Sequence, residues 1–260
     1  MPSGAKGPEG QEVNTTPANS PRAGGRQLKI RVRDILVSME MERALDEICR
    51  MPPRRVISPL FSLLYQGDDA LRWAAITAMG RVVARLADED REAARVVMRR
   101  FMWNLNDESG GIGWGSPEAM GEVLACHEGL AEEYASILIS YAREDGNYLE
   151  YEMLQRGLLW GIARLAQARP HLVRGTASHF IPYLQSKDPA IRGMAAYLMG
   201  LLEVQKARPN IESLREDDAG FETWADYRIV HRRVKDMANE ALDRLSASES
   251  KRLDRTGGLS

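Results

Sequence analysis

The sequence predicts an all-α protein, an α-solenoid of about four helical hairpins. Three observations support this: a segment recurs about every 40 residues, a glycine marks the same position in each copy, and apolar residues recur at i, i+3, i+4 and i+7. A hairpin of this length cannot bury its own apolar faces. Neighbouring hairpins must therefore stack into a one-dimensional array.

The repeat is clearest between Leu64–Val82 and Leu184–Leu202, which align at an offset of 120 residues. This offset equals three periods of about 40 residues. The shared positions include an Asp, an Arg, two Ala, a Met and a Gly: Asp68, Ala70, Arg72, Ala75, Met79 and Gly80 match Asp188, Ala190, Arg192, Ala195, Met199 and Gly200. The two segments are therefore copies of one structural unit.

Two intermediate copies lie at Ile112–Val123 and Leu158–Leu165. The four marker glycines are 41, 40 and 39 residues apart, at Gly80, Gly121, Gly161 and Gly200. A glycine inside a helix costs about 1 kcal/mol relative to alanine. A glycine that recurs at one repeat position therefore predicts close packing against the next helix.

These residues resemble the HEAT-repeat superfamily, in particular the bacterial HEAT-like repeats of phycobilisome lyase subunits. The resemblance covers roughly residues 55–202, and its strongest positions are Asp68, Arg72, Ala75, Ala78 and Gly80, echoed by Asp188, Arg192, Ala195 and Gly200. Gly113 and Met153 replace the arginine in the two middle copies, which are degenerate. The superfamily specifies a fold and says little about function.

The two ends differ from the repeats. We expect a disordered tail over residues 1–26, a solenoid with an N-terminal capping helix over 27–204, a C-terminal capping segment over 205–248 and a disordered tail over 249–260. The capping helix is predicted over Lys29–Arg50, with Pro52 and Pro53 ending it.

The C-terminal segment allows two interpretations. A β-hairpin can pair about Ile211–Arg215 with Tyr227–His231, followed by a closing helix over Arg232–Leu245. Alternatively, a single helix can run from Glu222 to Leu245, because its apolar residues recur at helical spacing. We favour the hairpin slightly.

The repeat is interrupted between Asn104 and Pro117, where four glycines replace helix-forming residues. Proline suits the first helical position, so we expect the next helix to begin near Pro117 with Ser116 as its N-cap. This start is about six residues late, which leaves a gap of roughly 9 Å. The loop 104–117 is either a long connection or a binding site.

Departures from a repeat are often functional, so the candidate binding residues lie in this loop and directly before and after it. They are Trp103, Asp107, Glu108, Gly111, Gly113, Trp114, Glu118, Glu122, His127 and Glu128. The two tryptophans would anchor a partner. Glu118 and Glu122 share one helix face and could also act as paired carboxylates, although solvated glutamates are the commoner case.

Charge is unevenly distributed along the chain. Residues 105–160 carry eleven acids against Arg143 and Arg156, a net charge of −9, while the whole chain has −2. A solvated helical face is the default interpretation, but the clustering favours a partner with a basic surface. The acidic middle separates the basic residues near the two ends, so we expect no nucleic-acid partner.

We assign no catalytic residue, metal or cofactor. The four histidines share no ligand spacing, the glycine-rich loop lacks the Lys-Ser/Thr ending of a phosphate loop, and adjacent residues such as Cys126 and His127 do not face each other on a helix. The HEAT-repeat hydroxylases that bind two irons use repeated His-Glu pairs, whereas this chain has one, His127-Glu128.

We expect a cytoplasmic protein without a membrane span, because the chain has two cysteines, no secretory signal and no long apolar run. The first functional hypothesis is a protein-interaction scaffold that uses its concave face and the loop 104–117. The alternative, by analogy with bilin lyases, is a small-molecule or cofactor-handling protein that uses the cavity at the interrupted second repeat.

Overall fold

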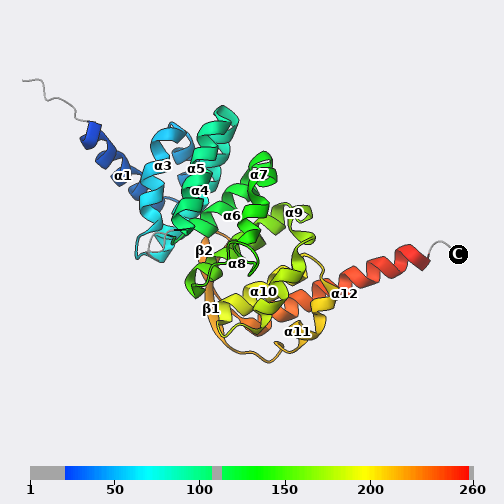
Figure 1. Ribbon diagram of the computed structural model, residues 1–260. Helices are drawn as coiled ribbons and strands as arrows, with labels where there is room; N and C mark the ends of the chain where they lie inside the picture. Colours follow the sequence, from blue (N-terminus) through cyan, green and yellow to red (C-terminus); the bar gives the residue numbers. More distant parts are fainter. Residues whose placement is uncertain (1–20, 107–112, 258–260) are drawn as a thin grey trace, which may run out of the picture.

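The structure is a computed structural model that describes residues 21–106 and 113–257, with side chains described for 24–106 and 113–250. Four hairpins follow one another along the chain (Figure 1). They are α3 (Pro53–Leu64) with α4 (Asp69–Glu89), α5 (Arg91–Leu105) with α6 (Ser116–Cys126), α7 (Glu128–Ser140) with α8 (Glu152–Ala168), and the 3-10 helix η1 (Ala177–Gln185) with α10 (Pro189–Leu201). A short helix, α9 (His171–Arg174), precedes η1. The predicted all-α solenoid is confirmed.

The repeated aspartates are helix caps. The Asp68 side chain accepts a hydrogen bond from the Leu71 amide at the start of α4, and Asp188 accepts from Ala190 and Ile191 at the start of α10. A side-chain oxygen at this position satisfies amides that have no partner inside the helix. The repeated residue is thus explained by local backbone chemistry.

The marker glycines lie where the second helices of successive hairpins contact each other. A Cβ atom on Gly121 of α6 would lie 2.3 Å from Gly161 Cα of α8, and one on Gly80 of α4 would lie 2.5 Å from Glu122 Cγ of α6. Gly200 of α10 faces Ala241 of α12 (Val234–Gly257) in the same way. The predicted close packing is confirmed, and α4, α6, α8, α10 and α12 form one continuous layer.

The N-terminal cap consists of two helices, α1 (Pro21–Ser38) and α2 (Met41–Cys49), so the prediction of a single helix over Lys29–Arg50 was wrong. Glu40 adopts an extended backbone conformation, with ψ 138°, which ends the helical path. Helix α1 begins inside the expected N-terminal tail.

The C-terminal segment contains η2 (Gln205–Ala207), α11 (Arg208–Glu212) and an antiparallel hairpin of β1 (Gly220–Ala225) and β2 (Arg228–Arg233). A hairpin is present, as favoured, and the single-helix alternative was wrong. The predicted first strand was also misplaced, because Ile211 and Glu212 end α11 and residues 213–215 form the turn that follows. Helix α12 follows β2 and runs to Gly257, within the expected C-terminal tail.

The interrupted second repeat has the predicted late start, because α6 begins at Ser116 with Pro117 in its first turn. Gly115 is the N-cap, in place of the predicted Ser116, and has a left-handed backbone with φ +72°. A Cβ atom there would lie 3.1 Å from Leu64 Cβ of α3, so both backbone and space favour glycine. Asp107, Glu108 and Gly111 lie outside the described residues.

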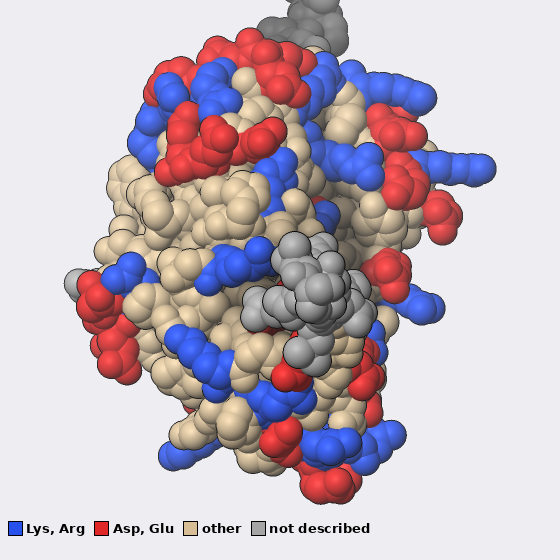
Figure 2. Space-filling view, turned by 90° about the vertical axis from the view of Figure 1, so that its right-hand side faces the viewer, with Lys and Arg blue, Asp and Glu red and all other residues tan. Residues whose placement is uncertain are grey.

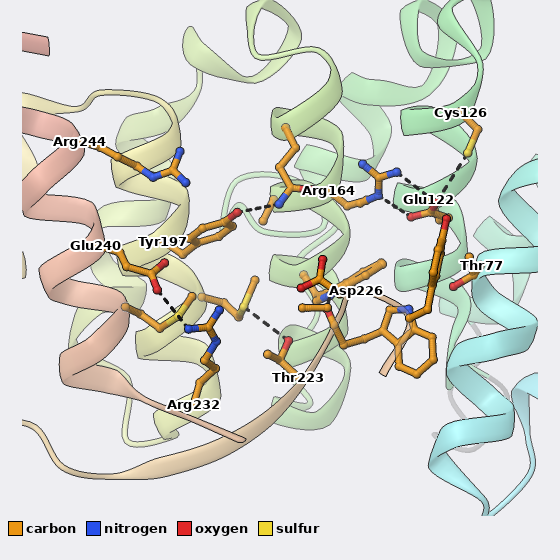
Figure 3. Close-up of a pocket in the computed structure, with 18 of the residues that line it drawn as sticks. Thr77, Glu122, Cys126, Arg164, Tyr197, Thr223, Asp226, Arg232, Glu240 and Arg244 are labelled. Carbon is orange, nitrogen blue, oxygen red and sulfur yellow. Dashed lines mark hydrogen bonds and ion pairs between the residues drawn. The ribbon is translucent and has the colours of Figure 1, made fainter. Parts of the chain in front are cut away.

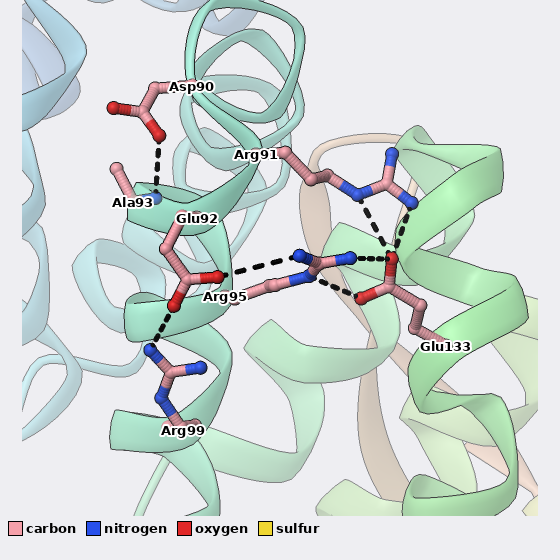
Figure 4. Close-up of polar contacts among 7 residues, drawn as sticks. All are labelled: Asp90, Arg91, Glu92, Ala93, Arg95, Arg99 and Glu133. Atoms are coloured by element: carbon pink, nitrogen blue, oxygen red, sulfur yellow. Dashed lines mark hydrogen bonds and ion pairs between the residues drawn. The ribbon is translucent and has the colours of Figure 1, made fainter.

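The acidic segment does not form one continuous solvated face. Of its described acids, Glu118 and Glu122 are buried and Glu133 is half-buried, while six are exposed: Glu128, Glu132, Glu144, Asp145, Glu150 and Glu152. Glu133 of α7 accepts hydrogen bonds from Arg91 and Arg95 of α5, which links two hairpins (Figure 4). Basic and acidic side chains are interspersed over the face shown in Figure 2.

Candidate functional site

The β-hairpin lies across the layer of second helices. At one end Phe221 packs on Gly193 of α10, where a Cβ atom would lie 2.4 Å from its ring. At the other end the Tyr227 hydroxyl accepts a hydrogen bond from Arg81 of α4, over 3.5 Å. The hairpin therefore spans the helices from α10 to α4 and covers the groove between them.

Three tryptophans, Trp73, Trp160 and Trp224, hold the hairpin on the helices and are called the tryptophan cluster below. The rings of Trp224 in β1 and Trp73 in α4 stack with centroids 6.0 Å apart and an interplanar angle of 4°. Trp160 of α8 lies 4.7 Å from Trp73, and its Nε1 donates to the Trp224 carbonyl oxygen at 3.0 Å. The cluster leaves a cavity on each side.

The larger cavity has a volume of about 600 Å³ and is lined by α4, α6, α8, α10, the hairpin and α12 (Figure 3). Its charged side chains are four arginines and three acids: Arg81, Arg164, Arg232, Arg244, Glu122, Asp226 and Glu240. Tyr197, Gln167 and Met194 complete the part of the wall from α8 and α10. This wall combines aromatic, amide and guanidinium groups in one space.

Ion pairs fix most of these arginines. Arg164 contacts Glu122 at 2.7 Å and Arg232 contacts Glu240 at 3.1 Å, and Figure 3 shows each pair pointing toward each other inside the cavity. Arg81 pairs with Glu42 of α2. Arg244 lies over the Tyr197 ring at 5.5 Å and has no carboxylate partner among the residues that the structure describes. It is therefore available to a ligand.

Cys126 also lines this cavity, with its Sγ atom 3.6 Å from Glu122 Oε1. Burial raises the pKa of the thiol to about 12, and the neighbouring Glu122 carboxylate adds to the shift. Since the thiolate is the nucleophilic form, this shift disfavours the reactive form of Cys126 at neutral pH.

The smaller cavity, of about 290 Å³, lies on the other side of the cluster, beside the N-terminal ends of α4, α6, α8 and α10. Glu118 and Gly157 are buried at its floor, while Asp69, Met153 and Glu222 are exposed at its rim. The cavity therefore opens to solvent.

Glu118 is an unusual side chain. It is 8% exposed, and its Oε2 is the one buried side-chain oxygen or nitrogen without a hydrogen-bond partner among the described residues. Burial raises its pKa to about 7, partly opposed by a hydrogen bond to its own backbone and by Arg72. Strongly shifted titratable groups in a cavity are often functional.

The sequence-predicted residues lie in several places. Glu118 and Glu122 share the buried face of α6, but each lines a different cavity, so they do not form a carboxylate pair. Trp103, on α5, is 76% exposed and Trp114, before α6, is 37% exposed. Neither tryptophan lines the two cavities described above.

Gly113 packs against Leu154, and its carbonyl accepts a hydrogen bond from the Ser116 amide. His127 is the N-cap of α7, where its Nδ1 accepts from the Leu130 amide and its Nε2 lies 3.3 Å from Asp88. Glu128 is exposed in the first turn of α7. These three residues also lie outside the linings of both cavities.

Sequence reasoning missed the tryptophan cluster and the arginines of the larger cavity. One signal could have found Arg164. Gly121 and Gly161 contact each other, Glu122 follows the first and Arg164 lies three residues after the second. The register of the marker glycines therefore places this acid beside this arginine. No comparable signal places Trp224.

No group of three potential metal ligands gathers within the residues that the structure describes. None of the helices in that same part of the chain is long and apolar enough to span a membrane.

Comparison with known proteins finds an uncharacterized relative and solved repeat proteins of low similarity. No family model matches the chain. An uncharacterized protein from Archaeoglobus fulgidus is 25% identical over 194 residues, which cover 72% of this chain and 95% of that protein.

The similar solved structures are repeat proteins and engineered proteins. A designed armadillo repeat protein in complex with the peptide (KR)4 matches with a TM-score of 0.48 and 14% identity, covering 84% of this chain and 99% of that one. A second designed armadillo repeat protein has a TM-score of 0.46 and 16% identity, with the same coverage. An engineered protein has a TM-score of 0.49 and 13% identity, over 85% of this chain and 98% of its own. The order and packing of the helices themselves show a helical-repeat solenoid, and the resemblance to phycobilisome lyase repeats stays a prediction.

Proposed function

We propose that this chain is a helical-repeat scaffold that binds a segment of a partner protein in its larger cavity. The proposal rests on a cavity of about 600 Å³. Its walls come from the second helices of four successive hairpins, from the β-hairpin and from α12. Repeat proteins bind their partners along surfaces built from consecutive repeats. Arg244 and Tyr197 supply the kinds of side chain that contribute most at protein interfaces.

The partner proposed here carries basic groups that meet the exposed acids of the third hairpin. Six of the described acids between 105 and 160 are exposed, and all of them lie on α7, on α8 or in the connection between them, which supports electrostatic complementarity with a basic surface. Trp103 and Trp114 are proposed as further anchors beside the loop 104–117, since large exposed aromatic side chains are common in binding surfaces.

Photo-cross-linking in the native host tests this proposal. Benzoylphenylalanine replaces Gln167, which is exposed at the cavity rim and donates a hydrogen bond to Tyr197. The matched control carries it at Val96, exposed on α5. We expect a discrete cross-linked protein from position 167 only, and its loss when Arg244→Glu is added.

Equal cross-linking from both positions, or none from 167, would contradict the proposal. The contribution of the loop is tested separately with the double variant Trp103→Ala, Trp114→Ala. If the cross-linked partner binds this variant as tightly as it binds the original protein, the two tryptophans are not anchors.

A second candidate function is the handling of a small molecule or cofactor. The volume of the larger cavity, about 600 Å³, favours it, because ligand pockets commonly measure roughly 300–1,000 Å³. Native mass spectrometry of the protein purified from its host is the test. A stoichiometric bound mass that Thr77→Trp removes supports this candidate, whereas a mass equal to that of the chain alone opposes it.

A further inference from the structure

A single carboxylate, that of Glu118, lies at the floor of the smaller cavity. Glu118 lies in the first turn of α6 and faces Gly157 of α8, where an added Cβ atom would lie 2.3 Å from Oε1. The absence of a side chain at Gly157 therefore provides the space for the carboxylate. Among the described residues its Oε2 has no donor, although a buried carboxylate oxygen normally has one.

Part of the wall of this cavity is apolar and aromatic. Trp73, Trp160 and Phe221 contribute rings, and Met153 and Met194 contribute thioethers. Aromatic ring faces attract cations, and the attraction is stronger where water is excluded. The walls thus suit an aliphatic chain that ends in a positive charge.

The charged residues around the cavity favour a cation. Arg72 is paired with Asp69 on α4, and Arg156 of α8 is paired with Asp188 at the start of α10. Glu222 of β1 adds a further acid at the rim. Both arginines have acidic partners of their own, and the charge of Arg72 compensates Glu118 only in part, since the pKa of Glu118 stays raised.

We propose that the smaller cavity binds an alkylammonium group, which donates a charge-assisted hydrogen bond to Glu118 while Trp73 and Trp160 contact its methylene carbons. One carboxylate alone does not hold a metal ion, whereas it suffices for an ammonium group. The ammonium belongs either to a lysine side chain of a protein or to a free small amine. This inference does not depend on what the larger cavity binds.

Binding should depend on pH in a defined direction. Burial raises the pKa of Glu118 to about 7, and an ammonium group binds the ionised carboxylate. Binding therefore displaces a proton near neutrality. We expect affinity to rise about tenfold from pH 6 to pH 8 and to level off above that range. The other charged groups that face the cavity are Asp69 and Arg72 of α4, Arg156 of α8 and Glu222 of β1.

Titration of the full chain, followed by tryptophan fluorescence and calorimetry, tests the proposal at pH 6, 7 and 8. The two probes are butylammonium chloride and the peptide acetyl-Gly-Lys-Gly-amide, at constant ionic strength. We expect saturable binding, release of protons at pH 7 detected by comparing two buffers, and at least a tenfold loss in Glu118→Gln together with loss of the pH dependence. Glu128→Gln is the control, because Glu128 is exposed outside the cavity.

The two probes distinguish the sources of the ammonium group. Tighter binding of the peptide indicates a lysine of a protein, and tighter binding of butylammonium indicates a free amine. The proposal is overturned if neither probe saturates, if Glu118→Gln binds like the original protein, or if binding strengthens as the pH falls. Circular dichroism of Glu118→Gln verifies that the variant folds, and the proton release of the unaltered protein provides a test that needs no variant.

Discussion

Two glutamates one turn apart on α6 have opposite surroundings. Glu122 lies in the larger cavity and accepts hydrogen bonds from Arg164 of α8, whereas Glu118 lies in the smaller cavity opposite Gly157 of the same helix. Gly157 and Arg164 are seven residues apart, so they occupy one face of α8 about two turns from each other. The neighbouring helix thus neutralises one buried acid and leaves space beside the other.

Burial alone therefore does not determine the role of a carboxylate. A buried acid with a cation stabilises the contact between two repeats only while both partners are present. A buried acid without one lowers stability at high pH, and such a cost is often retained at functional sites. Glu122 is therefore a structural group in our interpretation, and Glu118 is a binding group.

The largest expected change in stability comes from removing Arg164, the cation that pairs with Glu122. Arg164→Ala leaves Glu122 buried without its partner, and we expect the free energy of unfolding to fall by about 3 kcal/mol. Urea denaturation at pH 7 measures it. Adding Glu122→Gln should restore more than 1 kcal/mol of this loss.

Arg143→Ala is the matched control, because Arg143 pairs with the exposed Asp145. Exposed pairs contribute roughly 0–1 kcal/mol. Equal losses in Arg164→Ala and Arg143→Ala would remove the distinction between the buried pair and a surface pair.

Ionisation of the unpaired acid, Glu118, should lower the free energy of unfolding as pH rises. Because burial raises its folded-state pKa to about 7, ionisation of Glu118 destabilises the protein as pH rises from its usual range through 7. We expect Glu118→Gln to gain about 2 kcal/mol in unfolding free energy relative to the original protein between pH 4.5 and pH 8. Denaturation series at both pH values measure the gain, and a constant difference would contradict it.

The smallest expected change in stability comes from Glu133, a third glutamate of the acidic segment 105–160. Arg95 and Arg91 hold the pKa of Glu133 at about 2, so its contribution is present above the usual carboxylate range and is lost as pH falls toward 2. Because Glu133 and its two arginines are only half-buried, solvent screens their interaction, and we expect Glu133→Gln to cost about 1 kcal/mol at pH 7 and less near pH 2. Glu132→Gln, at the exposed neighbouring position, should change stability by less than about 0.5 kcal/mol in the same thermal and urea measurements.

Several features of the fold could be predicted because they depend on neighbouring residues. The period of the marker glycines predicted both the hairpins and their close packing, which Gly121 and Gly161 confirm. The late start of α6 followed from Pro117, whose ring fixes a helical φ angle. The repeated aspartates had a local role, since Asp68 and Asp188 cap the helices that follow them.

Other features of the fold were predicted wrongly, and each error has an identifiable reason. The hairpin turns at Asp226 and Tyr227, both with positive φ, and a turn without glycine carries only a weak sequence signal. The first strand was consequently misplaced. The break between α1 and α2 at Glu40 was missed because apolar spacing continues on both sides of it.

The sequence alone is enough to predict a helical solenoid, its repeat period and the interruption at residues 104–117, which Glu118 follows directly. Three other features depend on tertiary contacts. β1 crosses the second helices, Trp224 stacks on Trp73 about 150 residues earlier in the chain, and Arg164 faces one glutamate while Gly157 faces the other. Helix periods and caps arise from contacts within a few residues, so they can be predicted from the sequence. Burial and ion pairing between repeats arise from residues that only folding brings together.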